Sequence, residues 1–320
     1  MALSVTATRA PTRAPTRAPA SERRARRKVP LIPRLTHAAV FAIPGLLIYG
    51  AFVLIPMVTN VVNSFTDLNP FKLGTSWVGL DNYTDLLADD DFLSALGNTA
   101  ILTAIVIVVP NVTGLGIATL LDRRGWFYNA LRGVFFIPVV LSSVVVSVIW
   151  QAVLTDGGLL NRGLRAVGVD SPPGWLSEPD LALYSIAFVI SWQVLGFCVV
   201  VYLAGLQSIP AELYEAAVID GAGSLTRFRH VTWPLLAPAV TINTVMLLIT
   251  AFKAYDHVQV ITNGGPGTGT TATIAFDIVQ TSFVQNHVGY SAAMATLMLV
   301  IIAVLSGAAL RVLQRREVTM

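Results

Sequence analysis

The residues with the most distinctive types and spacing lie between 215 and 234, in a polar stretch between two long apolar runs. It opens with Glu215, Ala216 and Ala217, continues through Gly221, and closes at Pro234. Alanine favours a helix, and Gly221 permits the positive φ that ends one. The stretch pairs no nucleophile with a base, so the chemistry it suggests is contact with a partner, through two short helices joined by a bend.

The second of these short helices is expected to begin after Gly221, where Ser224 can cap it. It carries Leu225 and Phe228, three residues apart, with Arg229 beside them. An apolar pair flanked by basic residues suits a helix lying on lipid headgroups, and it equally suits a docking element for a cytoplasmic partner. Composition alone does not separate these two interpretations.

The composition of the whole chain indicates a membrane protein. Of 320 residues, 54% are hydrophobic and only 12% are charged, whereas soluble domains have about 25% charged residues. Continuous apolar runs near the ~20 residues that a crossing helix needs predict six transmembrane helices in an all-α fold. The predicted spans are residues 38–62, 95–121, 133–154, 182–205, 236–252 and 288–310.

Basic residues are distributed unequally between the loops, and this asymmetry predicts the orientation. Nine Lys and Arg lie in residues 9–34, and further arginines follow the second and fourth spans. Because basic loops face the cytoplasm, we expect both termini and the loop 206–235 to be cytoplasmic. Residues 1–35, with their repeated Thr-Arg-Ala-Pro, are predicted to be a disordered basic tail that touches anionic lipid and not nucleic acid.

The remaining boundaries follow from these spans. We expect a first transmembrane helix over 36–62, an extracytoplasmic segment over 63–94, a transmembrane core over 95–312, and a short cytoplasmic tail over 313–320.

Asn111 is an isolated polar residue in the second span and is expected to bond another helix. The histidines His230 and His287 lie far from other ligand-type residues, so no metal site and no catalytic set are predicted.

Polar side chains inside the fourth and fifth spans are candidates for the path of a solute, because such residues usually face a cavity or another helix. Aromatic faces and amide or hydroxyl groups have the chemistry to bind a sugar, although helix packing and interface positions explain several of the same residues. The candidates are Ser191, Trp192, Gln193, Asn243, Thr250 and Tyr255.

The polar stretch resembles the EAA loop of permease subunits of binding-protein-dependent ABC importers. Glu215, Ala216, Ala217, Gly221 and Pro234 match that pattern, and apolar Val231 and Trp233 replace its Ile and Leu. Further segments are similar to the subgroup that handles sugars and glycerol-phosphate-like solutes. These are "WVGLDNYTDLL" with "FLSALGNT", "FFIPVVLSSVVVSVIWQ", "LAGLQSIPAELYEAA" and "ITNGGPGT", so that only residues 1–35 fall outside the resemblance.

The resemblance implies a type I importer permease fold in the cell inner membrane, forming half of a translocation pathway for a di- or oligosaccharide. It implies a second permease as heterodimer partner, two ATP-binding subunits that use ATP and Mg²⁺, and an extracytoplasmic solute-binding protein. This chain has no G-x-x-x-x-G-K-[ST] loop and is expected to hold no cofactor itself. The residues implied in coupling to the ATPase are Glu215, Ala216, Ala217, Gly221, Leu225, Phe228 and Arg229.

Two alternatives stay open. The same importer class could carry glycerol phosphate or another polyol, for which Lys253 would supply a cation. A membrane enzyme or a channel would need paired acids or histidines at one depth, or a polar stripe along one span, and neither pattern is visible.

Overall fold

The computed structural model describes residues 42–315, so the predicted tail 1–35 and the last residues of the predicted tail 313–320 lie outside it. The chain separates into two units, residues 1–54 and 55–320. The described part of the first unit is helical and ends in the π-helix η1 (Gly50–Leu54). Residues 42–315 contain no β-strand, and the isolated bridge between Thr66 and Trp77 is their only strand-like pairing.

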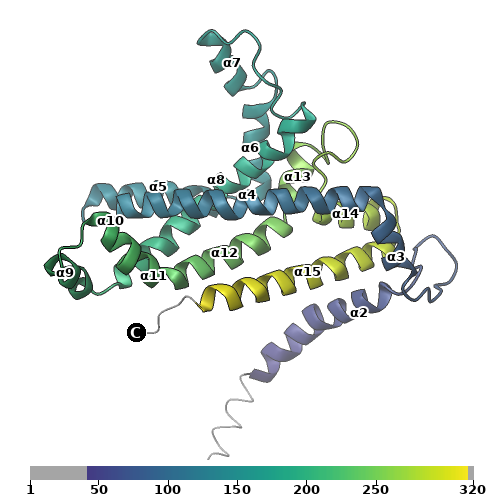
Figure 1. Ribbon diagram of the computed structural model, residues 1–320. Helices are drawn as coiled ribbons and strands as arrows, with labels where there is room; N and C mark the ends of the chain where they lie inside the picture. Colours follow the sequence, from purple (N-terminus) through teal and green to yellow (C-terminus); the bar gives the residue numbers. More distant parts are fainter. Residues whose placement is uncertain (1–41, 316–320) are drawn as a thin grey trace, which may run out of the picture. The chain divides into compact units, whose positions relative to one another are not determined.

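The second unit consists of helices and the segments that connect them (Figure 1). Its helices are α2 (Ile55–Asn63), α3 (Asp81–Ala88), α4 (Asp90–Leu121), α5 (Trp126–Val140), α6 (Ser143–Leu154), α7 (Leu159–Ala166), α8 (Pro179–Ser208), α9 (Ala211–Ile219), α10 (Ser224–Arg227), η2 (Phe228–Thr232), α11 (Trp233–Leu235), α12 (Ala237–Phe252), α13 (Asp256–Ile261), α14 (Ile274–Val279), η3 (Gln280–Val284) and α15 (Val288–Gln314).

The all-α membrane fold predicted from the sequence is confirmed. Within residues 42–315, five helices are long and apolar enough to cross a membrane, and a sixth crossing results if a pair bent by 62° counts as one. That pair joins Ser224–Leu235 to Ala237–Phe252. The five single helices are Ala42–Asn63, Asp90–Leu121, Ser143–Ala166, Pro179–Ser208 and Val288–Gln314.

The core of the second unit lies where α4, α8 and α12 pack together. Leu102, Ile186 and Leu247 are buried there. The hydroxyl of Tyr202 on α8 donates to the side-chain oxygen of Asn111 on α4 at 2.5 Å. Such bonds join helices in lipid, where a polar group has few other partners. The expectation that Asn111 bonds another helix is therefore confirmed.

The predicted span 133–154 is divided between two helices. α5 ends at Val140, Leu141 and Ser142 are extended, and α6 begins at Ser143. Pro138 lacks the N–H that would continue the hydrogen-bond ladder, which weakens the helix at this point. The carboxamide nitrogen of Gln193 donates to the carbonyl of Leu141 at 3.0 Å, so the neighbouring helix satisfies a backbone group that the break leaves free.

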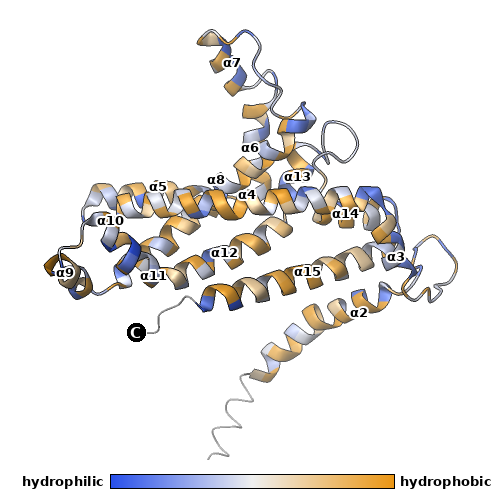
Figure 2. Cartoon of the chain, viewed as in Figure 1, coloured by the Kyte–Doolittle hydropathy of each residue, from blue (hydrophilic) through white to orange (hydrophobic). Residues whose placement is uncertain are grey.

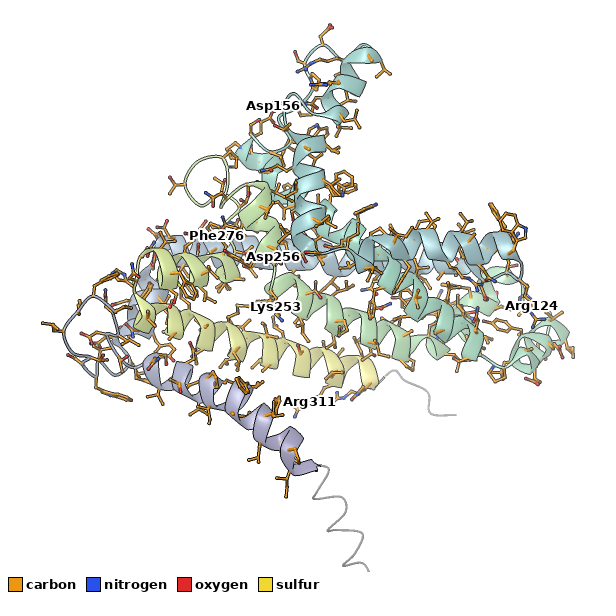
Figure 3. The ribbon with its side chains drawn as sticks, turned by 180° about the vertical axis from the view of Figure 1, so that it is seen from behind. Arg124, Asp156, Lys253, Asp256, Phe276 and Arg311 are labelled. Carbon is orange, nitrogen blue, oxygen red and sulfur yellow. The ribbon has the colours of Figure 1, made fainter. Side chains whose placement is uncertain are left out.

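The two ends of the second unit are formed by different short helices. α9, α10 and α11 lie at one end of the long helices, and α3 and α14 lie at the other (Figure 1). Hydrophobic residues predominate along α12 and α15, and hydrophilic ones gather near both ends (Figure 2). Arg124 lies at the end with α9 and α10, whereas Phe276 lies toward the opposite end (Figure 3).

Candidate functional site

The bend that the sequence predicts at Gly221 is present, and backbone hydrogen bonds fix it. The N–H groups of Asp220, Gly221 and Ala222 donate to the carbonyls of Ala216, Val218 and Ala217 at 2.9, 3.0 and 2.9 Å. Gly221 has a φ of +77°, which suits glycine because it lacks a Cβ. This is the Schellman ending of a helix. The spacing from the alanine pair to the glycine therefore has a structural cause: the alanine carbonyls accept the bonds that close the bend.

The loop 206–235, which we call the coupling loop, presents apolar side chains to its surroundings. Leu225 is 80% exposed and Ile219 is 86% exposed. Glu215, Ala216 and Arg229 are also exposed, whereas Ala217 and Phe228 are half-buried. Exposed apolar residues grouped with charged ones mark contact surfaces. The predicted coupling residues therefore share this segment with a further exposed apolar side chain, Ile219.

The second short helix is attached to the rest of the coupling loop and to the next long helix. The hydroxyls of Tyr214 and Thr232 are 3.0 Å apart, which ties α9 to η2. The rings of Phe228 and Trp233 are 6.4 Å apart. The chain then continues through α11 into α12 with a bend of 62°. The second short helix is thus joined to α9 by a side-chain contact and to α12 by a short, bent connection.

A cavity of about 230 Å³ lies between α5, α6, α8, α12 and α13. Its polar lining includes Gln193 and Thr250, both predicted for the solute path, together with Ser143 and His257. The side-chain oxygen of Gln193 lies 2.8 Å from Nε2 of His257. Since the Gln193 nitrogen holds the Leu141 carbonyl, this side chain connects the break after α5 with α13.

The other predicted path residues do not line this cavity. Ser191 and Asn243 are buried, and the Asn243 amide nitrogen lies 3.5 Å from the carbonyl of Cys198. Trp192 packs edge-on against Trp150, with ring centroids 5.4 Å apart. Tyr255 donates to Gln259 at 3.3 Å and stacks on Phe276. Trp192 and Asn243 thus contact neighbouring helices, whereas the Ser191 hydroxyl and the Asn243 side-chain oxygen are buried without a hydrogen-bond partner among the described residues.

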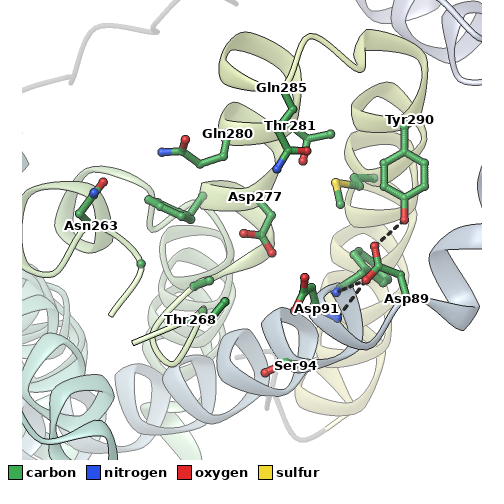
Figure 4. A pocket seen from close by; sticks show the side chains of 16 residues that line it. Asp89, Asp91, Ser94, Asn263, Thr268, Asp277, Gln280, Thr281, Gln285 and Tyr290 are labelled. Carbon is green, nitrogen blue, oxygen red and sulfur yellow. Dashed lines mark hydrogen bonds between the residues drawn. The ribbon is translucent and has the colours of Figure 1, made fainter. Parts of the chain in front are cut away.

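A second, larger pocket of about 400 Å³ (Figure 4) is lined by α14 and its neighbours, which lie at the opposite end from α9 and α10 (Figure 1). We call it the acidic pocket, because Asp89, Asp91 and Asp277 line it together with amide and hydroxyl side chains. Burial and the charges of Asp91 and Asp89 raise the pKa of Asp277 to about 7. The pocket combines the start of α4, the glycine-rich residues 263–269, α14, η3 and the start of α15.

Sequence reasoning did not select His257 or Ile219, and it did not place Asp277 in one pocket with Asp89 and Asp91. His257 follows the fifth span directly, in a polar run that marks the end of that span. Ile219 stands between the alanine pair and Gly221, where an apolar residue has no helix partner to cover it. Asp277 is separated by more than 180 residues from Asp91, so only the fold brings the two carboxylates together.

Comparisons with known proteins agree with this architecture. Residues 111–318 match the family model "Binding-protein-dependent transport system inner membrane component". The chain is 35% identical over 281 residues to the probable starch degradation products transport system permease protein AmyD of Thermoanaerobacterium thermosulfurigenes, covering 88% of this chain and 95% of that protein. It is 34% identical to the diacetylchitobiose uptake system permease protein NgcF of Streptomyces coelicolor, covering 85% and 80%.

Solved structures show the same fold. A chain of the bacterial alginate ABC transporter in complex with an alginate pentasaccharide-bound periplasmic protein superposes with a TM-score of 0.75, at 20% identity, covering 89% of this chain and 96% of that one. The chain therefore belongs to the family of binding-protein-dependent transport system inner membrane components. It is a multi-pass inner-membrane permease subunit of an ABC importer, and this family transports solutes without catalysing a reaction of its own.

Proposed function

We propose that this chain forms half of the translocation pathway of an ATP-driven importer of a di- or oligosaccharide. The names of its relatives support the cargo, since they are described as permeases for starch degradation products, diacetylchitobiose and multiple sugars. The Gln193, Thr250 and His257 side chains supply amide, hydroxyl and imidazole groups at one cavity, and these are groups that bond sugar hydroxyls. A second permease subunit completes the pathway.

The coupling loop is the part through which ATP hydrolysis acts on this chain. Its exposed Leu225 and Ile219 fit an apolar cleft on an ATP-binding subunit, and Glu215 and Arg229 orient the contact by charge. Two such ATP-binding subunits supply ATP and Mg²⁺ chemistry that this chain does not perform. The observation that carries this proposal is the bend at Gly221, which presents the second helix beyond the long helices.

An alternative cargo, a glycerol phosphate, would need a cation on the path. Lys253 is exposed at the end of α12 and is not among the residues that line the 230 Å³ cavity. The described contacts therefore favour an uncharged saccharide over a phosphate ester.

Gly221→Ala tests the coupling role. A Cβ at this position meets no atom within 4 Å, so the substitution strains only the backbone, by roughly 1 kcal/mol or more. We expect the assembled importer to keep its ATPase activity while sugar uptake falls several-fold, because the second helix no longer sits at the same angle.

The matched control is Gly97→Ala, which also adds a Cβ in open space but in ordinary helical backbone. Uptake of radiolabelled saccharide and release of phosphate are measured on the same vesicles. Equal uptake by Gly221→Ala and Gly97→Ala would contradict the coupling role.

A further inference from the structure

No basic side chain among residues 42–315 lines the acidic pocket. One oxygen of Asp89 accepts from the N–H of Asp91 at 2.9 Å, and the other accepts from the Tyr290 hydroxyl at 2.7 Å. Among the described residues, the side chains of Asp91 and Asp277 have no hydrogen-bond or ion-pair partner. Burial and the neighbouring carboxylates both raise the pKa of Asp277, and like charges held close together without a cation destabilise one another.

A second observation points to a missing ligand. Thr281 lines the acidic pocket and is only 5% exposed, yet its hydroxyl has no partner among the described residues. The hydroxyl oxygen is not itself fully buried, so a group that enters the pocket can reach it. Figure 4 shows Thr281 on the same side of the pocket as Gln285, facing the region around Asp277. The pocket thus offers a free acceptor in addition to its carboxylates.

The arrangement favours an extended cation over a metal ion. Within residues 42–315, no three acidic, His or Cys side chains come close enough together to hold a metal. The carboxylates instead surround a space of about 400 Å³. A guanidinium or ammonium group on a flexible side chain suits such a space, because it donates several hydrogen bonds in different directions.

We propose that the acidic pocket receives an arginine or lysine side chain of the extracytoplasmic solute-binding protein when that protein docks on this permease. The inference rests on the proposed function. The pocket lies at the end opposite the coupling loop, which is the end that a binding protein approaches. Charge complementarity of this kind steers docking and fixes its register. The basic side chain would form ion pairs with Asp91 and Asp277, and no proton would be transferred between them.

The test uses the complete importer in lipid nanodiscs, with its cognate binding protein loaded with saccharide. ATPase stimulation is titrated against the concentration of binding protein for the wild type, Asp91→Asn and Asp277→Asn. Both substitutions preserve side-chain shape. We expect each to raise the half-saturating concentration by roughly tenfold or more while leaving the maximal stimulated rate nearly unchanged. Raised salt should weaken the wild type more than the variants.

Asp170→Asn is the control, since this exposed acid lies outside the pocket and should behave as wild type. If both pocket variants saturate at the wild-type concentration, the pocket does not bind the docking protein and the inference is wrong. A fall in maximal rate with unchanged half-saturation would assign the pocket to the saccharide instead, which also overturns it. If the wild-type complex shows no stimulation at all, the proposed function fails, and this result is distinct from the other two.

Discussion

Folding raises the pKa of the Asp277 carboxyl. Its pKa rises from 3.8 to about 7 because the carboxyl is partly buried and faces Asp91 and Asp89. The folded protein therefore binds this proton more tightly than the unfolded chain does. The contribution of the Asp277 carboxyl to the free energy of unfolding is present in full below pH 3.8. It is lost progressively as the pH rises from about 4 to 7.

Asp277→Asn should therefore stabilise the protein in a pH-dependent manner. The variant and the wild type should have equal melting temperatures near pH 4, where both side chains are neutral. Above pH 7 the variant should melt at a higher temperature, because it removes the repulsion by Asp91 and Asp89. Melting of the purified chain by intrinsic fluorescence checks this, and Asp170→Asn provides the comparison. A difference between variant and wild type that is the same at pH 4 and pH 8 contradicts the assignment.

At the residue scale, the sequence predicted local geometry better than long-range contacts. The bend at Gly221 follows from the alanine pair and the glycine, which are only a few residues apart, so local hydrogen bonds determine it. Gln193 was selected for its polarity, but its bonds to Leu141 and His257 depend on how three helices meet. No local pattern encodes that meeting.

At the scale of elements, α8 packs against α5 with almost no space between the backbones. A Cβ on Gly196 would lie 2.1 Å from the carbonyl oxygen of Phe135 and 2.9 Å from the Cα of Phe136. Small residues allow such close approach of membrane helices. Since the clashing atoms are backbone, no side-chain rotation relieves the overlap, and α5 must move.

Gly196→Ala should accordingly destabilise the protein by about 1–3 kcal/mol, the range for overpacking a well-packed core. Gly97→Ala adds the same methyl group to α4 with no atom within 4 Å, and it should be neutral or stabilising because alanine favours a helix. Unfolding in a denaturing detergent titration measures both. Similar midpoints for the two variants would show that α5 and α8 are farther apart than described.

The break between α5 and α6 shows what hydropathy alone misses. Residues 133–154 carry no charge and are mostly apolar, so their length predicts one crossing helix. The interruption depends on Pro138 and on the partner that Gln193 supplies to Leu141. The proline is visible in the sequence, but prolines in membrane helices often leave the helix intact. Only the tertiary contact decides between these outcomes.

At the scale of the whole molecule, the orientation in the membrane is a proposal that the distribution of arginines supports. Arg124 lies at the end with the coupling loop, and Asp170 lies in the connection between α7 and α8. Both are exposed. The chain has a single cysteine, Cys198, which is fully buried, so introduced cysteines can be labelled against a low background.

In intact cells, a membrane-impermeant maleimide should label Asp170→Cys and should not label Arg124→Cys. Permeabilised cells should give labelling of both, which verifies that each cysteine is accessible. The wild type with only Cys198 is the control and should stay unlabelled. Labelling of Arg124→Cys in intact cells would reverse the proposed orientation, and with it the side on which the coupling loop meets its partner.

The bond between Gln193 and the Leu141 carbonyl offers a way to follow the importer as it works. The carbonyl belongs to an extended residue between two helices, and its partner belongs to a third. Any rearrangement that slides α8 past α5 must lengthen this bond, and a carbonyl that loses a hydrogen bond vibrates at a higher frequency. An isotope label at Leu141 would make the break a spectroscopic reporter of each turnover, without a dye or an added mutation.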